Sequence, residues 1–118
     1  MVYAWNDSVP IYRQLRDRVV AMILDGELKQ GEAVPSVRQV AVDYQINPLT
    51  VSKAYQDLVD ENLLEKRRGL GLFVGDGARE RLLQLERERF LHEEWPLLRA
   101  RLARLDLDLP TLLNKGDA

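Results

Sequence analysis

Residues 47–74 read NPLTVSKAYQDLVDENLLEKRRGLGLFV, and this stretch decides the fold. Asn47-Pro48 marks the start of a helix, because an Asn side chain caps free N–H groups and Pro suits the first helical turn. After Val51, apolar residues recur at the third, fourth, seventh and eighth positions, which predicts a helix over about 48–61 with one buried face. The remainder predicts a two-stranded hairpin with a glycine-rich connection at 67–71 that permits positive φ angles.

Two further helices are predicted before this stretch. The first covers about 10–25 and carries apolar residues on one face. The second covers about 36–44, where Ser36 and Gln39 fit a capping box, and a tight turn at 45–46 follows it. Three helices with a tight turn between the second and third, followed by a hairpin, form a winged helix-turn-helix. We therefore predict a mainly α-helical protein with a small β-hairpin.

The composition is that of a small globular protein and excludes several kinds of site. The 118 residues are 46% hydrophobic and 31% charged, which suffices for a core without disulfides. With no Cys, a disulfide framework and a cysteine zinc site are excluded, and the single His leaves little room for a histidine metal cluster or a histidine-based triad. No nucleophile–base pair or phosphate-binding loop is visible, so we predict no enzyme, no metal and no cofactor. No apolar run spans a membrane and no signal peptide is visible, which favours the cytoplasm.

A change of composition at Gly75-Asp76-Gly77 predicts two parts, 1–75 and 76–118. The second part is rich in Leu, Arg and Glu, which predicts a long helix over about 78–104 with a kink or break at Pro96. A turn between 105 and 110 and a short helix near 110–113 are expected to follow.

A heptad seam runs along this second part. Apolar residues recur there at alternating spacings of four and three: Leu91, Trp95, Leu98, Leu102, Leu105, Leu109 and Leu112. We favour dimerisation of this arm over its packing on its own domain, because two DNA half-sites need two DNA-binding domains. The predicted interface residues are Leu91, Trp95, Leu98, Leu102 and Leu105. A small effector pocket beside the seam is an alternative role for His92, Trp95 and Arg99. Such residues are more often packing residues. Whether an effector exists, and which one, stays open.

Cations and short polar side chains gather where this fold meets DNA. The start of the third helix faces base edges, the second helix approaches phosphates, and the hairpin reaches the minor groove. Leu49 is suited to contact a thymine methyl group. The candidate DNA-binding residues are Ser36, Arg38, Asn47, Leu49, Thr50, Ser52, Lys53, Lys66, Arg67, Arg68, Gly69 and Gly71.

A second hypothesis is a winged helix that binds another protein, with the basic hairpin merely solvated. Acidic and basic residues nearly balance, at 19 against 17, and each DNA-facing feature taken alone is common in soluble proteins. Their combination on three neighbouring elements favours DNA. A steep loss of affinity with salt separates the two hypotheses.

Residues 10–74 resemble the DNA-binding domain of the GntR family of bacterial transcription regulators. The motifs that carry the resemblance are PIYRQL at 10–15, GEL at 26–28, QGE at 30–32, VPSVRQVA at 34–41 and the stretch at 47–74. Val34 and Asn62 replace the Leu and Gly that are common in the family. The motif NPLTVSKAY at 47–55 is similar to the corresponding sequence of the YtrA subfamily, whose C-terminal part is short.

The resemblance implies roles for matching positions. Arg38 resembles the family's phosphate- or base-contacting arginine, and Thr50, Ser52 and Lys53 match contacts of the recognition helix. Arg68, Gly69 and Gly71 match the wing. Pro48 stands where many relatives carry Arg or another polar residue, which shifts the expected base contacts to Asn47, Leu49 and Thr50.

These observations predict a homodimer that binds an inverted-repeat operator in double-stranded DNA. Repression by blocking a promoter is favoured over activation, because no activation segment is visible. The resemblance to the YtrA subfamily further implies control of a neighbouring membrane-transporter operon, often one for an ABC transporter.

Overall fold

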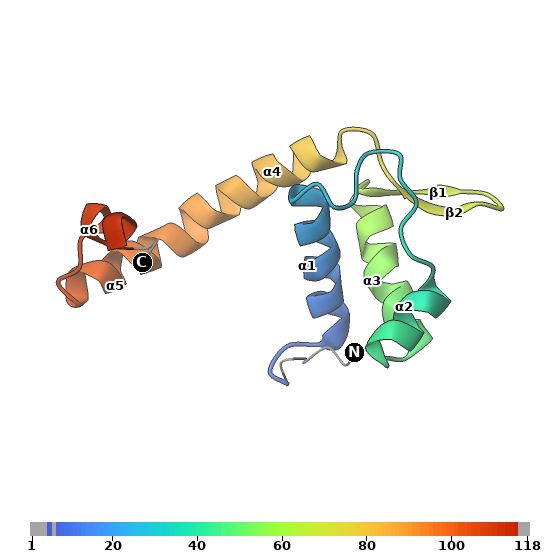
Figure 1. Cartoon of the computed structure of the whole chain (residues 1–118), viewed down its shortest axis with the longest axis horizontal. Helices are drawn as coiled ribbons and strands as arrows, with labels where there is room; N and C mark the ends of the chain where they lie inside the picture. Colours follow the sequence, from blue (N-terminus) through green and yellow to red (C-terminus); the bar gives the residue numbers. More distant parts are fainter. Residues whose placement is uncertain (1–4, 6, 116–118) are drawn as a thin grey trace. The chain divides into compact units, whose positions relative to one another are not determined.

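The computed structural model describes residue 5 and residues 7–115, and it divides the chain into two compact units, Met1–Leu83 and Gln84–Ala118. The first unit contains α1 (Ile11–Leu24), α2 (Val37–Tyr44), α3 (Pro48–Asp60), β1 (Leu64–Arg67), β2 (Gly71–Val74) and the start of α4 (Ala78–Arg89). Helices α1 and α3 lie side by side, α2 lies near the N-terminal end of α3, and the hairpin follows its C-terminal end (Figure 1). The predicted winged helix-turn-helix is confirmed.

The helix boundaries follow local capping signals. The Ser36 hydroxyl accepts the N–H of Gln39 at 3.1 Å, and the Asn47 side chain accepts the N–H of Leu49 at 2.8 Å. The capping box is only half formed, because the Gln39 side chain donates to Asp43 and not back to the backbone of Ser36. Gln45 ends α2 in the left-handed region at φ 55°, which makes the predicted tight turn.

The hairpin is antiparallel, and its register pairs Leu64 with Val74 and Arg67 with Gly71. The segment that precedes α2 pairs with the outer edge of the hairpin, where Ala33 forms a β-bridge with Phe73 of β2. Backbone hydrogen bonds between residues 31–34 and β2 complete this edge. This segment before Pro35 therefore anchors the hairpin to the start of α2.

The core of the first unit also takes in the beginning of α4. Ala78 and Leu82 are each 1% exposed and pack with the apolar faces of α1 and α3. The Arg79 side chain donates to the Leu24 carbonyl at 3.0 Å, which ties α4 to the end of α1. The first compact unit therefore extends to Leu83, beyond the compositional change at Gly75-Asp76-Gly77 from which the sequence predicted the boundary.

The second unit contains the end of α4, a π-helical turn η1 (Phe90–Glu94), α5 (Trp95–Arg104) and α6 (Leu109–Lys115). The distortion predicted at Pro96 takes the form of this π-helical turn, because Pro lacks the N–H that would continue the regular pattern. Asp106 adopts φ 55° and the N–H of Leu107 bonds to the Leu102 carbonyl, which ends α5. The heptad pattern from Leu91 to Leu112 is therefore divided between separate helices.

No residue of η1, α5 or α6 is buried within the described part of the chain. Large apolar side chains of these helices and of the segment between α5 and α6 remain exposed instead: Phe90, Leu91, Leu97, Leu98, Leu105, Leu107, Leu109 and Leu113. Trp95 and Leu102 of the predicted seam are half-buried. Within one copy, this unit does not bury its apolar surface.

Candidate nucleic-acid interface

The N-terminus of α2 offers hydrogen-bond donors to an anion. Capping by Ser36 uses the N–H of Gln39, while the first two N–H groups of the helix, those of Val37 and Arg38, bond to no acceptor in the described residues. The Arg38 side chain is exposed and forms no ion pair with any described residue. Backbone donors, the positive end of the helix dipole and a free guanidinium together favour a phosphate.

Tyr55 holds the chain just before this terminus. Its ring lies in the core at 3% exposure, and its hydroxyl donates to the Pro35 carbonyl at 2.7 Å. Burial, followed by the influence of Tyr44, raises the pKa of Tyr55 to about 12. Sequence periodicity placed Tyr55 in the core but gave no sign that its hydroxyl positions the segment leading to α2.

Tyr55→Phe is expected to lower the free energy of unfolding by about 1 kcal/mol at neutral pH, because one buried hydrogen bond is lost. The folded-state pKa lies above the ordinary value of 10.0, so the stabilisation from Tyr55 is complete below pH 10 and declines as the pH rises toward 12. Urea unfolding at pH 7, 10 and 11 should show the gap between wild type and variant narrowing with pH.

The control for this prediction is Tyr12→Phe, which removes a hydroxyl that forms no hydrogen bond with any described residue and keeps the ring that Lys53 contacts. It should leave the alkaline decline of the wild type in place. A gap between wild type and Tyr55→Phe that stays constant from pH 7 to 11 would contradict the role given to this hydroxyl.

The start of α3 differs from the start of α2 because its N–H groups are already satisfied. Pro48 has no N–H, the N–H of Leu49 bonds to the Asn47 side chain, and those of Thr50 and Val51 bond to the Asn47 carbonyl. Leu49 and Ser52 are exposed, whereas Thr50 is half-buried. The end of α3 therefore presents side chains and not backbone donors.

Lys53 lies one turn further along α3, on the exposed side that the sequence predicted. Its ammonium group lies 4.2 Å from the centre of the Tyr12 ring on α1, a cation–π contact. This contact restrains the Lys53 side chain beside α1. No local sequence pattern indicates this contact, because Tyr12 and Lys53 are far apart along the chain.

The hairpin carries three neighbouring cations, of which one contacts other side chains and two are exposed without an ion pair among the described residues. Arg67 stacks on Phe73, with its guanidinium carbon 4.3 Å from the ring centre, and lies 3.5 Å from Glu65. Lys66 and Arg68 are exposed and have no ion pair among the described residues. Gly69 at φ 77° closes the bend, where the N–H of Leu70 bonds to the Arg67 carbonyl. Arg68 is thus the free cation next to the bend.

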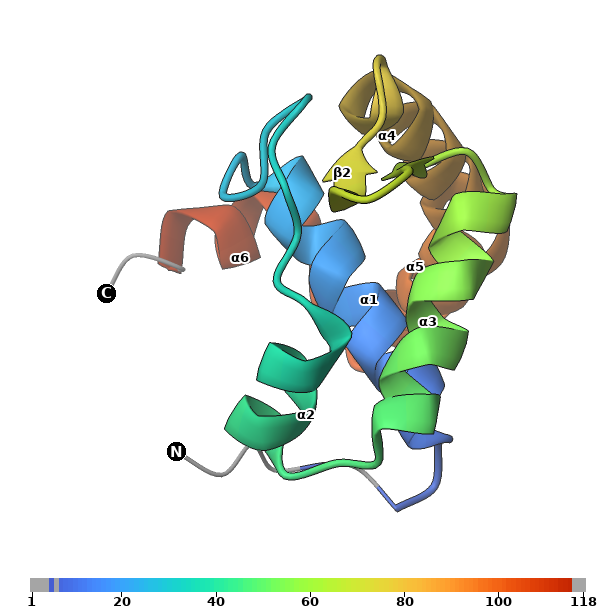
Figure 2. The same cartoon turned by 90° about the vertical axis from the view of Figure 1, so that its right-hand side faces the viewer.

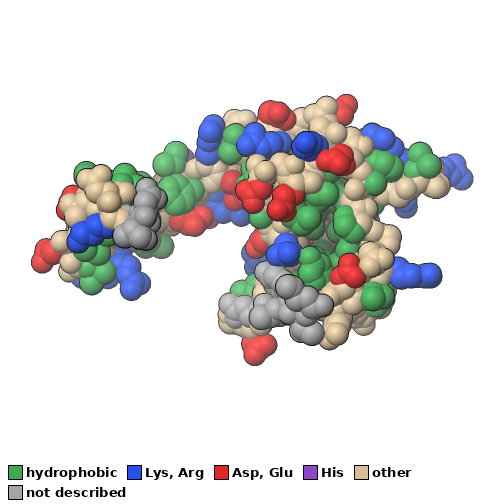
Figure 3. Space-filling model, in the orientation of Figure 1, with side chains coloured by type: hydrophobic (Ala, Val, Ile, Leu, Met, Phe, Trp, Pro, Cys, Tyr) green, Lys and Arg blue, Asp and Glu red, His purple; other side chains and the backbone are tan. Residues whose placement is uncertain are grey.

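Within the first unit, these groups lie on elements that face the same way. Figure 2 looks onto α2, the chain between α2 and α3, and the hairpin. In Figure 3, Lys and Arg side chains project from the outer part of the hairpin and from α2, on the side that Figure 2 views. The structure thus brings the predicted residues of α2 and the hairpin to one side of the unit.

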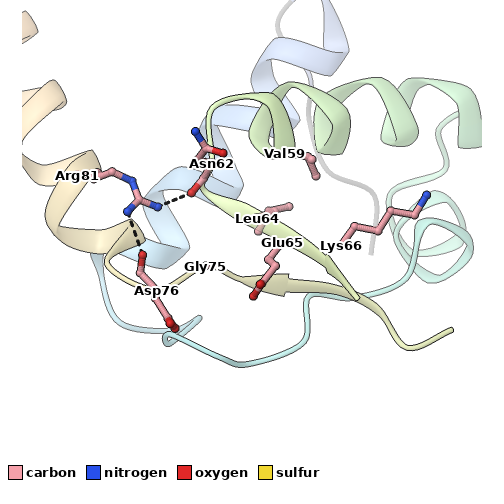
Figure 4. Close-up of a pocket in the computed structure, with 8 residues that line it drawn as sticks. All are labelled: Val59, Asn62, Leu64, Glu65, Lys66, Gly75, Asp76 and Arg81. Atoms are coloured by element: carbon pink, nitrogen blue, oxygen red, sulfur yellow. Dashed lines mark hydrogen bonds between the residues drawn. The ribbon is translucent and has the colours of Figure 1, made fainter. Parts of the chain in front are cut away.

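A pocket at the base of the hairpin was not predicted from the sequence (Figure 4). Arg81 of α4 donates to the carbonyls of Asn62 and Asp76, and so ties the end of α3 to the segment that leaves β2. Glu65 and Lys66 also line this pocket. Because the Arg81 guanidinium already bonds to protein oxygens, we assign it a structural role, and no local sequence pattern indicates such a long-range contact.

The remaining predictions concern metals, membranes and the second unit. Over residue 5 and residues 7–115, no three His, Asp or Glu side chains are grouped so as to hold a metal ion. No described helix is both long and apolar enough to cross a membrane. His92 and Arg99 are exposed and Trp95 is half-buried, and none of the three bonds to another described side chain.

Comparison with known proteins adds independent information. Residues 11–74 match the model of the family described as bacterial regulatory proteins, gntR family. The HTH-type transcriptional repressor YtrA of Bacillus subtilis is 39% identical over 79 residues, which cover 67% of this chain and 61% of YtrA. The chain thus spans about three fifths of the length of such relatives.

Solved structures agree on the fold. A transcriptional regulator from Oenococcus oeni superposes with a TM-score of 0.76 at 26% identity and covers 98% of both chains. The DNA-binding domain of AraR, in its crystal structure with operator ORX1, superposes with a TM-score of 0.58 at 24% identity. That match covers 64% of this chain and 95% of the AraR domain.

Proposed function

Because this chain belongs to the GntR family and is a DNA-binding transcription regulator, not an enzyme, we propose that it acts as a homodimeric repressor on an inverted-repeat operator. The observation that carries the proposal is the set of unpaired donors on α2 and the hairpin, on one side of the winged helix. Free cations and free N–H groups on one side match a phosphate backbone better than they match an apolar protein surface.

Each element has a distinct proposed role in DNA binding. The α2 terminus, with Ser36 and Arg38, binds a backbone phosphate and fixes the register. The start of α3 lies in the major groove with the candidates Asn47, Leu49, Thr50, Ser52 and Lys53. The hairpin lies along the minor groove, where Arg68 is favoured, Lys66 and Arg67 add charge, and Gly69 and Gly71 let the backbone approach closely.

The exposed apolar surface of the second unit supports the homodimer. Leu91, Leu98 and Leu105 are 57%, 42% and 53% exposed in one copy, and they alternate with the half-buried Trp95 and Leu102. A second copy that pairs these surfaces would remove them from water, with about 2,000 Å² buried in a stable dimer. Two winged helices in such a dimer would address two half-sites about one helical turn apart.

Repression is proposed because YtrA of Bacillus subtilis, a relative of this chain, is named a transcriptional repressor. Blocking of a promoter needs nothing beyond tight operator binding. On the resemblance to the YtrA subfamily alone, we extend the proposal to a neighbouring operon for a membrane transporter, with the identity of any effector left open.

The test is binding to the DNA upstream of the protein's own operon, and to duplexes selected from a random library, with random DNA as competitor. We expect a complex that survives the competitor and weakens by at least about a hundredfold between 50 and 200 mM salt. If no duplex shows salt-sensitive binding, the proposal is contradicted and the protein-binding hypothesis is favoured.

A further inference from the structure

The exposed apolar side chains of the first unit are concentrated on its DNA-facing elements. Among its described residues, the three most exposed large apolar side chains are Leu49 at 77%, Leu70 at 72% and Val42 at 67%. They lie at the start of α3, at the bend of the hairpin and on α2, respectively. An apolar contact with DNA would remove such a side chain from water.

Two polar side chains near Leu49, those of Asn47 and Lys53, already have contacts within the protein. Reading adenine with an Asn side chain takes both its oxygen and its nitrogen, and the Asn47 amide is held in a capping orientation because its oxygen accepts the N–H of Leu49 at 2.8 Å. Lys53 is held over the Tyr12 ring. In the first turn of α3, Leu49 is therefore the long side chain that is free to extend toward a base.

The surface beside Leu49 is also apolar. Pro48 at the first position of α3 lines a groove with Val42 and Ile46 between α2 and α3. Arg38 lines the same groove, and it lies one turn from Val42 along α2. This protein surface, with an unpaired guanidinium at the edge of an apolar groove, matches the surface of DNA. Phosphates flank the major groove of DNA, and an apolar group is present within it.

We propose that Leu49 determines operator specificity by packing against the C5-methyl group of a thymine in the major groove. The inference rests on the proposed DNA-binding function and adds its chemistry of recognition. Every other base-edge group in the major groove of unmodified DNA is a hydrogen-bond donor or acceptor or a C–H edge, so the thymine methyl is the apolar partner available. Each half-site then carries a thymine opposite the start of α3, and loss of its methyl group weakens binding.

The test replaces thymines of the selected operator one at a time by deoxyuridine, which removes the methyl group and keeps every hydrogen-bonding group. At one position of the half-site, wild-type affinity should fall about fourfold per half-site, as expected for one buried methyl-sized group. Leu49→Ala should bind the thymine and deoxyuridine duplexes equally. Since Leu49 is exposed, this variant should keep the circular dichroism spectrum of the wild type.

Leu70→Ala is the matched control, because it removes a similarly exposed Leu from the hairpin bend. It should retain the preference for thymine at the position that Leu49 reads. Wild-type binding that is unaffected by deoxyuridine at every position would overturn the inference and leave the proposed function standing, as would a Leu49→Ala variant that keeps the full preference. Absence of any specific duplex binding would overturn both.

Discussion

Leu98→Asp combined with Leu102→Asp is expected to halve the mass of the protein in solution. Both residues lie on α5, where no described side chain is buried within one copy. In the proposed dimer the double variant would place four carboxylates in an apolar interface, and each buried, unpaired charge costs several kcal/mol. Light scattering after size-exclusion chromatography at micromolar concentration should give a monomer for the variant and a dimer for the wild type.

Leu97→Asp is the control for this prediction. Leu97 is 74% exposed on the same helix but lies outside the four-and-three spacing of the seam. It should remain dimeric and bind the operator as the wild type does. The double variant should lose most operator affinity with its winged helix still folded, because each monomer then addresses a single half-site. An unchanged mass would refute the proposed interface.

Arg38→Ala is expected to lower operator affinity about ten- to a hundredfold, because each protomer loses a charge-assisted contact with a phosphate. The slope of log affinity against log salt should become shallower by about two for the dimer, one for each protomer. Fluorescence anisotropy titrations at four salt concentrations measure both quantities. Lys53→Ala is expected to act in the same direction.

The matched control for charge is Arg87→Ala, which removes an exposed cation of α4 in the second unit. Its affinity and salt slope should stay near those of the wild type. Circular dichroism should show full helix content in all three variants. Loss of helix in Arg38→Ala, or an unchanged salt slope, would argue against the phosphate contact.

The helix ends were predictable because their signals are local. Ser36 and Asn47 satisfy N–H groups two or three residues away, so the sequence reveals these contacts directly. The hairpin was likewise predictable from a glycine-rich bend between two short extended segments, near 64–66 and 72–74. The roles assigned to individual DNA-facing residues stay predictions, because binding depends on a partner molecule.

Contacts between distant parts of the chain could not be predicted. The Tyr55 hydroxyl meets Pro35, Lys53 meets Tyr12 and Arg81 meets Asn62, and each pair is joined only by the packing of separate elements. Periodicity shows which face of a helix is buried but not which atom of another element faces it.

The sequence by itself determined the winged helix-turn-helix, the order of its elements and the family, since caps, breaks and apolar spacing act within a few residues. The tertiary structure alone decided how many donors remain free for DNA. Within the described residues, it leaves the first two N–H groups of α2 and the side chain of Arg38 unpaired, stacks Arg67 on Phe73, and uses the Asn47 oxygen as a cap. It also extends the first unit into α4, because Ala78 and Leu82 complete its core. Pairing and burial depend on which surfaces meet in space, and one-dimensional spacing does not contain that information.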